Sequence, residues 1–224
     1  MNYKFVNGWK FPEYESRLCA IDENSESVYT GLSHINKALE YVEKFDIMVD
    51  VGANVGLISV PMSKKFNKVI AFECVPDTFE CLSYNLQTFT NNTEAHNFAV
   101  SNAAGTVDVA IPKQSGTMVS SGWASISKER QDAFNEKDYI QVQSITIDEL
   151  NLDCLDFLKI DVEQAEMMVI QGALETIQKF KPVIEFENKR RENQKVIELL
   201  NTIGYSIIPG KKAKSSEAIM IPSK

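Results

Sequence analysis

Two carboxylates stand directly after an apolar run, where they could act on a bound ligand. The run 156–160 reads as a buried strand, and Asp161 and Glu163 follow it in the segment KIDVEQAE, where a helical pattern begins. A carboxylate within hydrogen-bonding reach of a hydroxyl can orient it or accept its proton, so both residues are candidate catalytic groups. The same pair could offer oxygen ligands to Mg²⁺, although two carboxylates are only part of a magnesium site. Capping of the helix N-terminus and positioning of a cofactor are the structural alternatives.

A glycine-containing turn follows an earlier apolar run. Residues 46–51 read as a buried strand, and Gly52 and Gly56 lie in the heptapeptide DVGANVG at 50–56. Glycine at a strand-to-helix turn removes the Cβ that would obstruct both the turn and a ligand approaching the backbone. A dinucleotide fingerprint would have its middle glycine at the position of Asn54. Phosphate binding is therefore disfavoured, and a nicotinamide-dependent oxidoreductase is the lesser enzymatic alternative.

Two acidic residues near this turn suit a ligand that carries a positive charge and a sugar. Asp50 lies near the end of the first predicted strand, two residues before Gly52, where its carboxylate suits an ammonium group. Glu73 follows the next apolar run, 68–72, at a position where an acidic residue of nucleotide-binding sheets accepts hydrogen bonds from ribose hydroxyls. An ammonium group and a ribose together describe S-adenosylmethionine.

The chain alternates short apolar runs with longer helical patterns such as 164–177, which is typical of an α/β fold with a mainly parallel sheet. A helix that ends near Gly204 precedes two strands joined by a turn rich in Gly, Lys and Ser, which predicts a C-terminal antiparallel hairpin. We therefore expect a Rossmann-like, doubly wound, mainly parallel seven-stranded sheet with that hairpin and an N-terminal cap. The runs that read as buried strands are 46–51, 68–72, 95–100, 156–160 and 182–186.

A single domain is expected, in which an N-terminal cap and helix at 1–45 precede the sheet-forming part at 46–224. Within the cap, residues 30–45 carry apolar side chains at helical spacing and predict a helix that covers one face of the sheet. The polar segment 112–138 around Trp123 has two interpretations, a surface hairpin or flexible insertion and a lid that faces the substrate.

Composition and charge exclude several classes of function. The formal net charge is -8 and the pI is near 4.9. Nucleic-acid affinity depends largely on Lys and Arg, so no nucleic-acid partner is expected. No stretch approaches the roughly 20 apolar residues of a membrane span or has the form of a signal peptide, so a cytoplasmic protein is predicted.

The histidines and cysteines are not expected to carry chemistry. The four cysteines and two histidines show no zinc-ligand spacing. His34 lies on the predicted N-terminal helix and His96 at a strand start, and both are interpreted as structural or surface residues. Cys74 follows Glu73 directly and is interpreted as an inert buried thiol.

Taken together and in this order, the motifs resemble the FkbM-type family of class I S-adenosylmethionine-dependent methyltransferases. The resemblance covers about residues 46–187 and rests on VDVGANVGLIS, AFECVPDTFECLSYNL, NFAVSNAAGTVDV and ITIDELNLDCLDFLKIDVEQAEMMVIQGA, followed by KPVIEFE. It implies transfer of a methyl group to a hydroxyl of a sugar, a glycan or a related small molecule. A cofactor-binding or interaction module that has lost turnover is the non-enzymatic alternative.

The resemblance also implies roles residue by residue. The family has glycine directly after the acid that corresponds to Glu163, whereas this chain has Gln164, and that difference bears on how closely a substrate can approach. The implied cofactor and reaction-centre residues are Asp50, Gly52, Asn54 and Gly56 at the methionine end, Glu73 at the ribose, Asn97 to Ala99 near the adenine, and Asp161 with Glu163 at the reaction centre.

Overall fold

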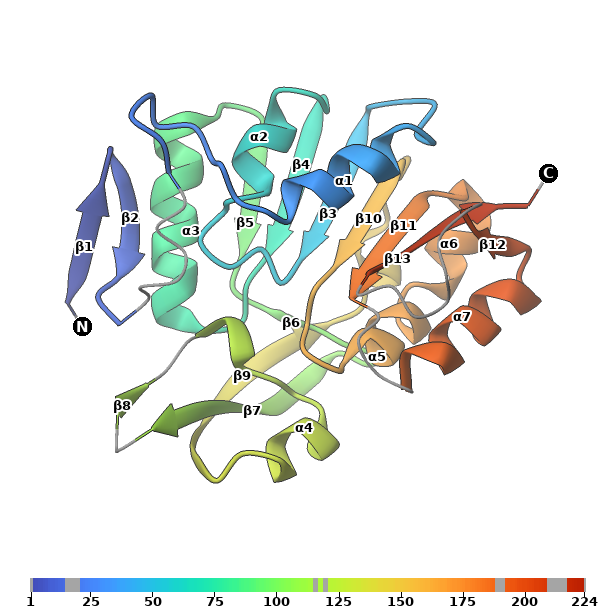
Figure 1. Ribbon diagram of the computed structural model, residues 1–224. Coiled ribbons are helices and arrows are strands. Elements are labelled where there is room, and N and C mark those ends of the chain that lie inside the picture. The colour runs from blue at the N-terminus through green and yellow to red at the C-terminus, as the bar shows by residue number, and fades with distance from the viewer. Residues whose placement is uncertain are drawn as a thin grey trace.

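The computed structural model describes residues 2–14, 21–114, 117–118, 121–187, 192–208 and 217–223. Its centre is a seven-stranded sheet with the order β12-β13-β11-β10-β3-β4-β5 (Figure 1). The strands from β5 to β11 run parallel, whereas β13 is antiparallel to both of its neighbours. The strands are β3 (Ile47–Val51), β4 (Lys68–Phe72), β5 (Thr93–His96), β10 (Phe157–Ile160), β11 (Val183–Glu187), β12 (Tyr205–Ile207) and β13 (Glu217–Pro222).

The central strands are apolar along almost their whole length because helices cover both faces of the sheet. The predicted doubly wound, mainly parallel sheet and its terminal hairpin of β12 and β13 are confirmed. The turn predicted within that hairpin, residues 209–216, lies outside the described residues. In the described part of the chain, no helix combines the length and the apolar character needed to cross a bilayer.

Two sets of helices cover the sheet. On one face, α1 (Leu32–Leu39), α2 (Ser59–Ser63) and α3 (Pro76–Phe89) pack against residues such as Val69 and Ala71. On the other face, α5 (Glu166–Gln171), α6 (Leu174–Phe180) and α7 (Glu192–Thr202) pack against Ile70 and Phe72. The alternation of these neighbours along β4 follows from the two-residue period of a strand.

Two predicted helices are shorter than expected. The helix predicted at 30–45 ends at Leu39, although Val42 beyond it is still buried in the same cluster. The pattern at 164–177 forms two helices, α5 and α6, which are interrupted at Gly172. A Cβ at Gly172 would lie 2.0 Å from the carbonyl oxygen of Ser101, so the helix end is pressed against another chain segment where only glycine fits.

The run predicted as one strand at 95–100 is divided between two sheets. Its first part belongs to β5, whereas β6 (Ala99–Val100) leaves the main sheet and pairs with β9. The chain turns at Asn97, whose side-chain amide donates hydrogen bonds to the carbonyl oxygens of Glu73 and Cys74, at 2.8 and 3.1 Å. The prediction of a single strand is therefore wrong.

A second sheet, with the order β6-β9-β7-β8, lies below the carboxyl ends of β3 and β4 in Figure 1. It is built on a long antiparallel pair, β7 (Gly105–Gln114) and β9 (Glu136–Ile145), whose register runs from Gly105 to Lys113. The intervening chain contains β8 (Thr117–Met118), the 3₁₀ helix η1 (Ser121–Trp123) and α4 (Lys128–Asp132), and a further 3₁₀ helix, η2 (Asp148–Leu150), follows β9. The pairing of β7 with β9 agrees with the interpretation of 112–138 as a hairpin, while residues 122–126 within it line the cavity described below, so the lid interpretation stays open.

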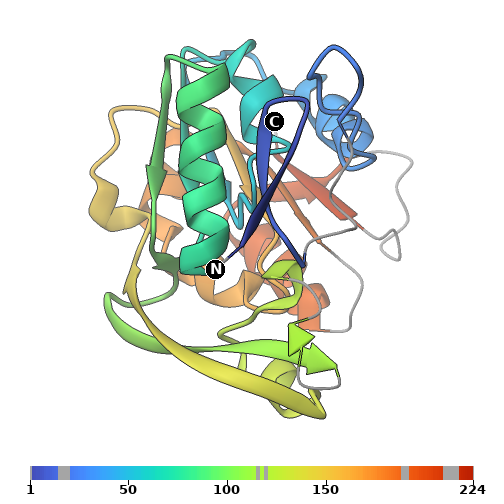
Figure 2. The same ribbon diagram turned by 90° about the vertical axis from the view of Figure 1, so that its left-hand side faces the viewer.

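The N-terminal cap begins with a hairpin, β1 (Tyr3–Val6) and β2 (Trp9–Pro12), that lies against α3 (Figure 2). Trp9 and Phe11 are fully buried in the cluster that α3 forms with the glycine turn. Asn85 on α3 accepts a hydrogen bond from Lys10 N at 2.7 Å and donates one to Lys10 O at 3.0 Å. The hairpin therefore supports the turn from outside, while the boundary at residue 45 stays a prediction.

Candidate active site

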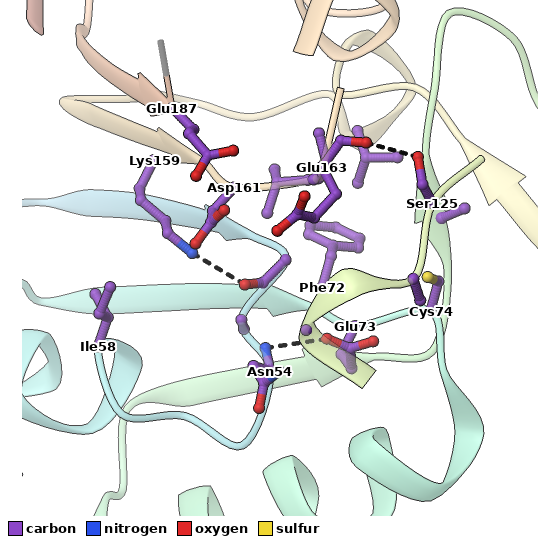
Figure 3. Close-up of a pocket in the computed structure, with 18 of the residues that line it drawn as sticks. Asn54, Ile58, Phe72, Glu73, Cys74, Ser125, Lys159, Asp161, Glu163 and Glu187 are labelled. Atoms are coloured by element: carbon purple, nitrogen blue, oxygen red, sulfur yellow. Dashed lines mark hydrogen bonds between the residues drawn. The ribbon is translucent and has the colours of Figure 1, made fainter. Parts of the chain in front are cut away.

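A cavity of about 340 Å³ lies at the carboxyl edge of the main sheet (Figure 3). Its walls come from the turn after β3, the ends of β4, β10 and β11, and residues 122–126 of the inserted segment. Of the predicted site residues, Gly52, Asn54, Glu73, Ala99, Asp161 and Glu163 line it, whereas Asp50, Gly56 and Asn97 support it from behind.

Gly52 makes the turn after β3 with a left-handed backbone, φ +75°. A Cβ at this position would lie 1.9 Å from the carbonyl oxygen of Asp161, at the end of the neighbouring strand. The backbone N–H groups of Gly52 and Ala53 both donate to Phe72 O, at 3.0 and 2.9 Å. The close neighbour is thus the backbone of the protein itself, and the missing Cβ is a requirement of folding as well as of ligand access.

Asp50 lies beneath the cavity wall and is fully buried. Its Oδ2 accepts a hydrogen bond from Ser59 Oγ at 2.6 Å, and its Oδ1 lies 2.9 Å from Lys159 Nζ. The Asp50 carboxylate is therefore already paired with the ammonium group of Lys159. The sequence-based prediction assigns it to the ammonium group of a ligand and does not include this pairing.

Lys159 lines the cavity, and the sequence interpretation missed it. The sheet register places it between Asp50 on β3 and Glu185 on β11, and only 3% of its surface is exposed. Its Nζ also donates to Gly52 O at 2.9 Å (Figure 3). Burial alone would lower the pKa of Lys159, but the neighbouring carboxylates, Asp50 first, outweigh burial and raise it. A lysine inside an apolar strand was the available signal, because lysine is almost never buried without a partner.

Glu73 follows β4 and is 6% exposed. Its Oε2 accepts a hydrogen bond from Asn54 N at 3.0 Å, and its Oε1 accepts one from Val75 N at 2.8 Å. Each oxygen of a carboxylate can accept more than one hydrogen bond, so both remain able to bind a ligand. Burial raises the pKa of Glu73 to about 7, against the lowering effect of the two backbone hydrogen bonds.

The wall beside Glu73 is mostly apolar. Phe98 and Ala99 line it from the β5–β6 connection, and Cys74 lines it from the turn after β4. Asn97 contributes indirectly, since its amide holds the carbonyl groups of Glu73 and Cys74. Burial raises the pKa of the Cys74 thiol, in line with its interpretation as an inert group.

Asp161 and Glu163 are brought together on the side of the cavity opposite Glu73 (Figure 3). Asp161 is exposed, whereas Glu163 is half-buried and forms an ion pair with Arg130, Nη2 to Oε2 3.4 Å. Ser125 Oγ donates to Glu163 O at 2.7 Å. The inserted segment therefore holds Glu163 through both its backbone and its side chain, and sequence reasoning gave no indication of this contact.

The backbone at Glu163 and Gln164 is left-handed, with φ +50° and +75°. This conformation costs a residue with a Cβ about 1 to 2 kcal/mol. Gln164 does not line the cavity, so its side chain is not in the path of a ligand.

Gln164→Gly should therefore stabilise the protein by about 1 kcal/mol and raise its Tm by roughly 2–4 °C. Gln164→Ala is the matched control, because it keeps the Cβ and removes the rest of the side chain. Thermal unfolding of the two variants isolates the backbone effect, and a glycine variant no more stable than the alanine variant would contradict it.

The structure gives no support to Mg²⁺ at Asp161 and Glu163. Among the described residues, the three metal-binding side chains that come together are Asp46, Cys154 and Asp156, at the opposite edge of the sheet. Asp156 Oδ2 already accepts hydrogen bonds from Asp46 N and Ile47 N, at 2.8 and 3.0 Å. This cluster therefore serves to join β3 and β10.

The strand order, the glycine turn after β3 and Glu73 after β4 define a Rossmann-like α/β protein with a cavity at the carboxyl edge of its sheet. The chain matches the protein family described as "Methyltransferase FkbM domain" over residues 50–207 and belongs to that family. Family membership agrees with the resemblance seen in the sequence and not with the oxidoreductase alternative.

The individual relatives share less than 30% sequence identity with the chain. Over 153 residues the chain is 27% identical to methyltransferase sdnD of Sordaria araneosa, covering 56% of this chain and 59% of that protein. Over 154 residues it is 28% identical to the hexuronic acid methyltransferase AglP of Haloferax volcanii, covering 67% of this chain and 59% of that protein. The solved structure of methyltransferase FkbM from Methylobacillus flagellatus superposes with a TM-score of 0.52 at 18% identity, over 79% of this chain and 43% of that one.

Proposed function

We propose that this chain transfers a methyl group from S-adenosylmethionine to a hydroxyl of a sugar, a glycan or a related small molecule. The observation that carries the proposal is Glu73, a buried carboxylate that lines the cavity and keeps acceptor capacity on both oxygens. The two hydroxyls of a ribose match this arrangement, since each can donate to one oxygen.

The cavity also has residues suited to the methionine end and the adenine of the cofactor. The methionine end would lie against Gly52 and Asn54, with the Lys159 ammonium available to its carboxylate. The adenine would lie against Phe98, Ala99 and Cys74, whose apolar surface suits a planar aromatic ring. When bound, S-adenosylmethionine supplies an electrophilic methyl group on a sulfonium.

Asp161 and Glu163 would hold the acceptor hydroxyl. Both line the cavity, and Arg130 and Ser125 fix the position of Glu163. Methyl transfer requires the acceptor oxygen to lie in line with the bond that breaks, so side chains that accept a hydrogen bond from the hydroxyl restrict its orientation. A sugar as the class of acceptor is supported by the name of one relative, a hexuronic acid methyltransferase.

The proposal is tested by release of S-adenosylhomocysteine with a panel of glucose, glucuronic acid, glucosamine, an oligosaccharide and catechol. With an accepted substrate, Asp161→Asn should lower turnover about tenfold while cofactor affinity changes little, because only the acceptor contact weakens. Glu163→Gln tests the neighbouring acid in the same way.

Asp153→Asn is the matched control, since Asp153 is an exposed carboxylate outside the cavity. If both cavity variants turn over like the wild type, the carboxylates have a structural role only. Tight cofactor binding without turnover on any acceptor would favour the alternative of a binding module.

A further inference from the structure

A second, smaller cavity of about 90 Å³ adjoins the first one on the side of α1. The two share part of their lining, which places them next to each other at the carboxyl edge of the sheet. The shared residues are Tyr29, Ile58, Lys159, Asp161 and Glu187. The polar side chains that line only the small cavity are His34 on α1, Glu185 on β11 and Glu217 on β13, and the apolar Ile35 and Ile160 complete its walls with Gly31.

His34 is held as half of a histidine–carboxylate pair in this cavity. Its Nδ1 lies 3.1 Å from Glu217 Oε2, and the two side chains are 37% and 20% exposed. The helix that carries His34 is anchored, because the adjacent Ile35 is buried in the core beneath α1. Glu217 is fixed by its place in the sheet, directly opposite Glu187.

The pairing determines which nitrogen of the imidazole is available. In a neutral imidazole one nitrogen carries the proton and the other accepts, and the hydrogen bond to one nitrogen decides the tautomer. A carboxylate at Nδ1 places the proton there, so Nε2 becomes the acceptor. A base oriented by a carboxylate on its far side is the arrangement by which histidine activates hydroxyls in other enzymes.

We propose that His34 Nε2 accepts the proton of the acceptor hydroxyl, and that the small cavity binds the hydroxyl-rich part of the acceptor around it. This inference rests on the proposed function. The acceptor oxygen forms a bond to the methyl carbon while the pair of electrons of the breaking C–S bond stays on sulfur. The proton of the hydroxyl passes to Nε2, and the resulting imidazolium is stabilised by Glu217 and later loses the proton to water.

The roles of the surrounding charges follow from this assignment. Asp161 lines both cavities and is left to orient the hydroxyl. The carboxylates of the small cavity can accept hydrogen bonds from further hydroxyls of the acceptor. The charged and titratable groups that line the cavity around His34 are Tyr29, Lys159, Asp161, Glu185, Glu187 and Glu217.

The other histidine, His96, lines neither cavity. It stacks on Phe72, with ring centroids 5.2 Å apart, and its Nε2 lies 3.8 Å from Glu94 Oε2. The environment of His96 therefore agrees with the sequence interpretation of a structural or surface residue. The environment of His34 is instead that of a general base.

The first test needs no methyl acceptor. With two histidines in the chain, ¹⁵N NMR at alkaline pH can assign the His34 ring by its disappearance in His34→Gln. The expected result is the Nδ1–H tautomer in the wild type and the Nε2–H tautomer, which is common in solvent-exposed histidine, in Glu217→Met, whose side chain has no oxygen to accept from Nδ1–H. An Nε2–H tautomer in the wild type would overturn the proposal, since that nitrogen could not then accept a proton.

The second test is kinetic and uses the acceptor found in the panel. His34→Gln should lower kcat by about 10²- to 10⁴-fold and abolish the acid limb of the pH–rate profile, while affinity for S-adenosylhomocysteine stays within about twofold. Glu217→Gln should lower kcat by about tenfold and keep the acid limb. Lys37→Gln, an exposed change on the same helix, is the control expected to keep full activity.

The failures of the two proposals are distinguishable. Wild-type kcat and pH dependence in a folded His34→Gln protein would overturn the role of His34 and leave methyl transfer intact. Absence of cofactor binding in the wild type would instead overturn the proposed function, on which the role of His34 depends.

Discussion

Lys159→Met should lower the free energy of unfolding by about 3–5 kcal/mol, which is the usual cost of removing one partner from a buried ion pair. The substitution keeps most of the side-chain volume but leaves Asp50 and Glu185 buried without their cation. It also removes the hydrogen bond to Gly52 O, so the glycine turn loses a direct support. For a chain of this size, the loss corresponds to a Tm lower by roughly 6–20 °C.

Urea unfolding of matched variants measures this effect. Lys68→Met is the control, because Lys68 also pairs with a glutamate on the main sheet, Glu94, but at an exposed position. It should change stability by less than about 1 kcal/mol. Asp50→Asn added to Lys159→Met should restore part of the loss. A Lys159→Met protein as stable as the Lys68→Met protein would show that the buried charges are not coupled.

Glu73→Gln should weaken the binding of S-adenosylhomocysteine about 10- to 150-fold, since a hydrogen bond to a charged group is worth about 1.5–3 kcal/mol. The amide keeps the shape of the carboxylate but directs an NH₂ group at one of the backbone donors, Asn54 N or Val75 N. Ligand affinity measured by calorimetry should fall, and Tm in the absence of ligand should fall by roughly 2–12 °C, because one buried backbone donor loses its acceptor at a cost of about 1–3 kcal/mol. Asp77→Asn on α3, outside the cavity, is the matched control.

The same residue predicts a pH dependence of cofactor binding. Burial raises the pKa of Glu73 to about 7 in the free protein. Ribose hydroxyls require the ionised form, so affinity should be full above about pH 7 and should decrease as the pH falls below it. Glu73→Gln should abolish this dependence. Affinity for S-adenosylhomocysteine that is unchanged between about pH 5.5 and pH 8 in the wild type would contradict the ribose assignment.

Local sequence patterns predicted the parts of the fold that are determined by residues close together in the sequence. The apolar runs gave the central strands, and the glycine turn and Glu73 were placed at the correct edge of the sheet because both follow such runs. The pair β7 and β9 was not predicted as a sheet of its own. One face of β9 is exposed, so its apolar residues alternate with polar ones and form no continuous run.

The contacts that sequence reasoning missed are long-range. Lys159 lies beside Asp50 only because of the register between β10 and β3. His34 meets Glu217 only because the last strand returns antiparallel to β11 and brings its first residue to the carboxyl edge. Neither pairing has a local signature, apart from the unusual presence of a lysine in an apolar strand.

The most direct test of the account is isothermal titration of the wild-type protein with S-adenosylmethionine, S-adenosylhomocysteine and NAD⁺. We expect one site per chain for the first two ligands, competition between them, and no binding of NAD⁺. Binding of S-adenosylhomocysteine should weaken in Glu73→Gln. A folded wild-type protein that binds NAD⁺, or that binds neither S-adenosylmethionine nor S-adenosylhomocysteine, would contradict the assignment of this cavity.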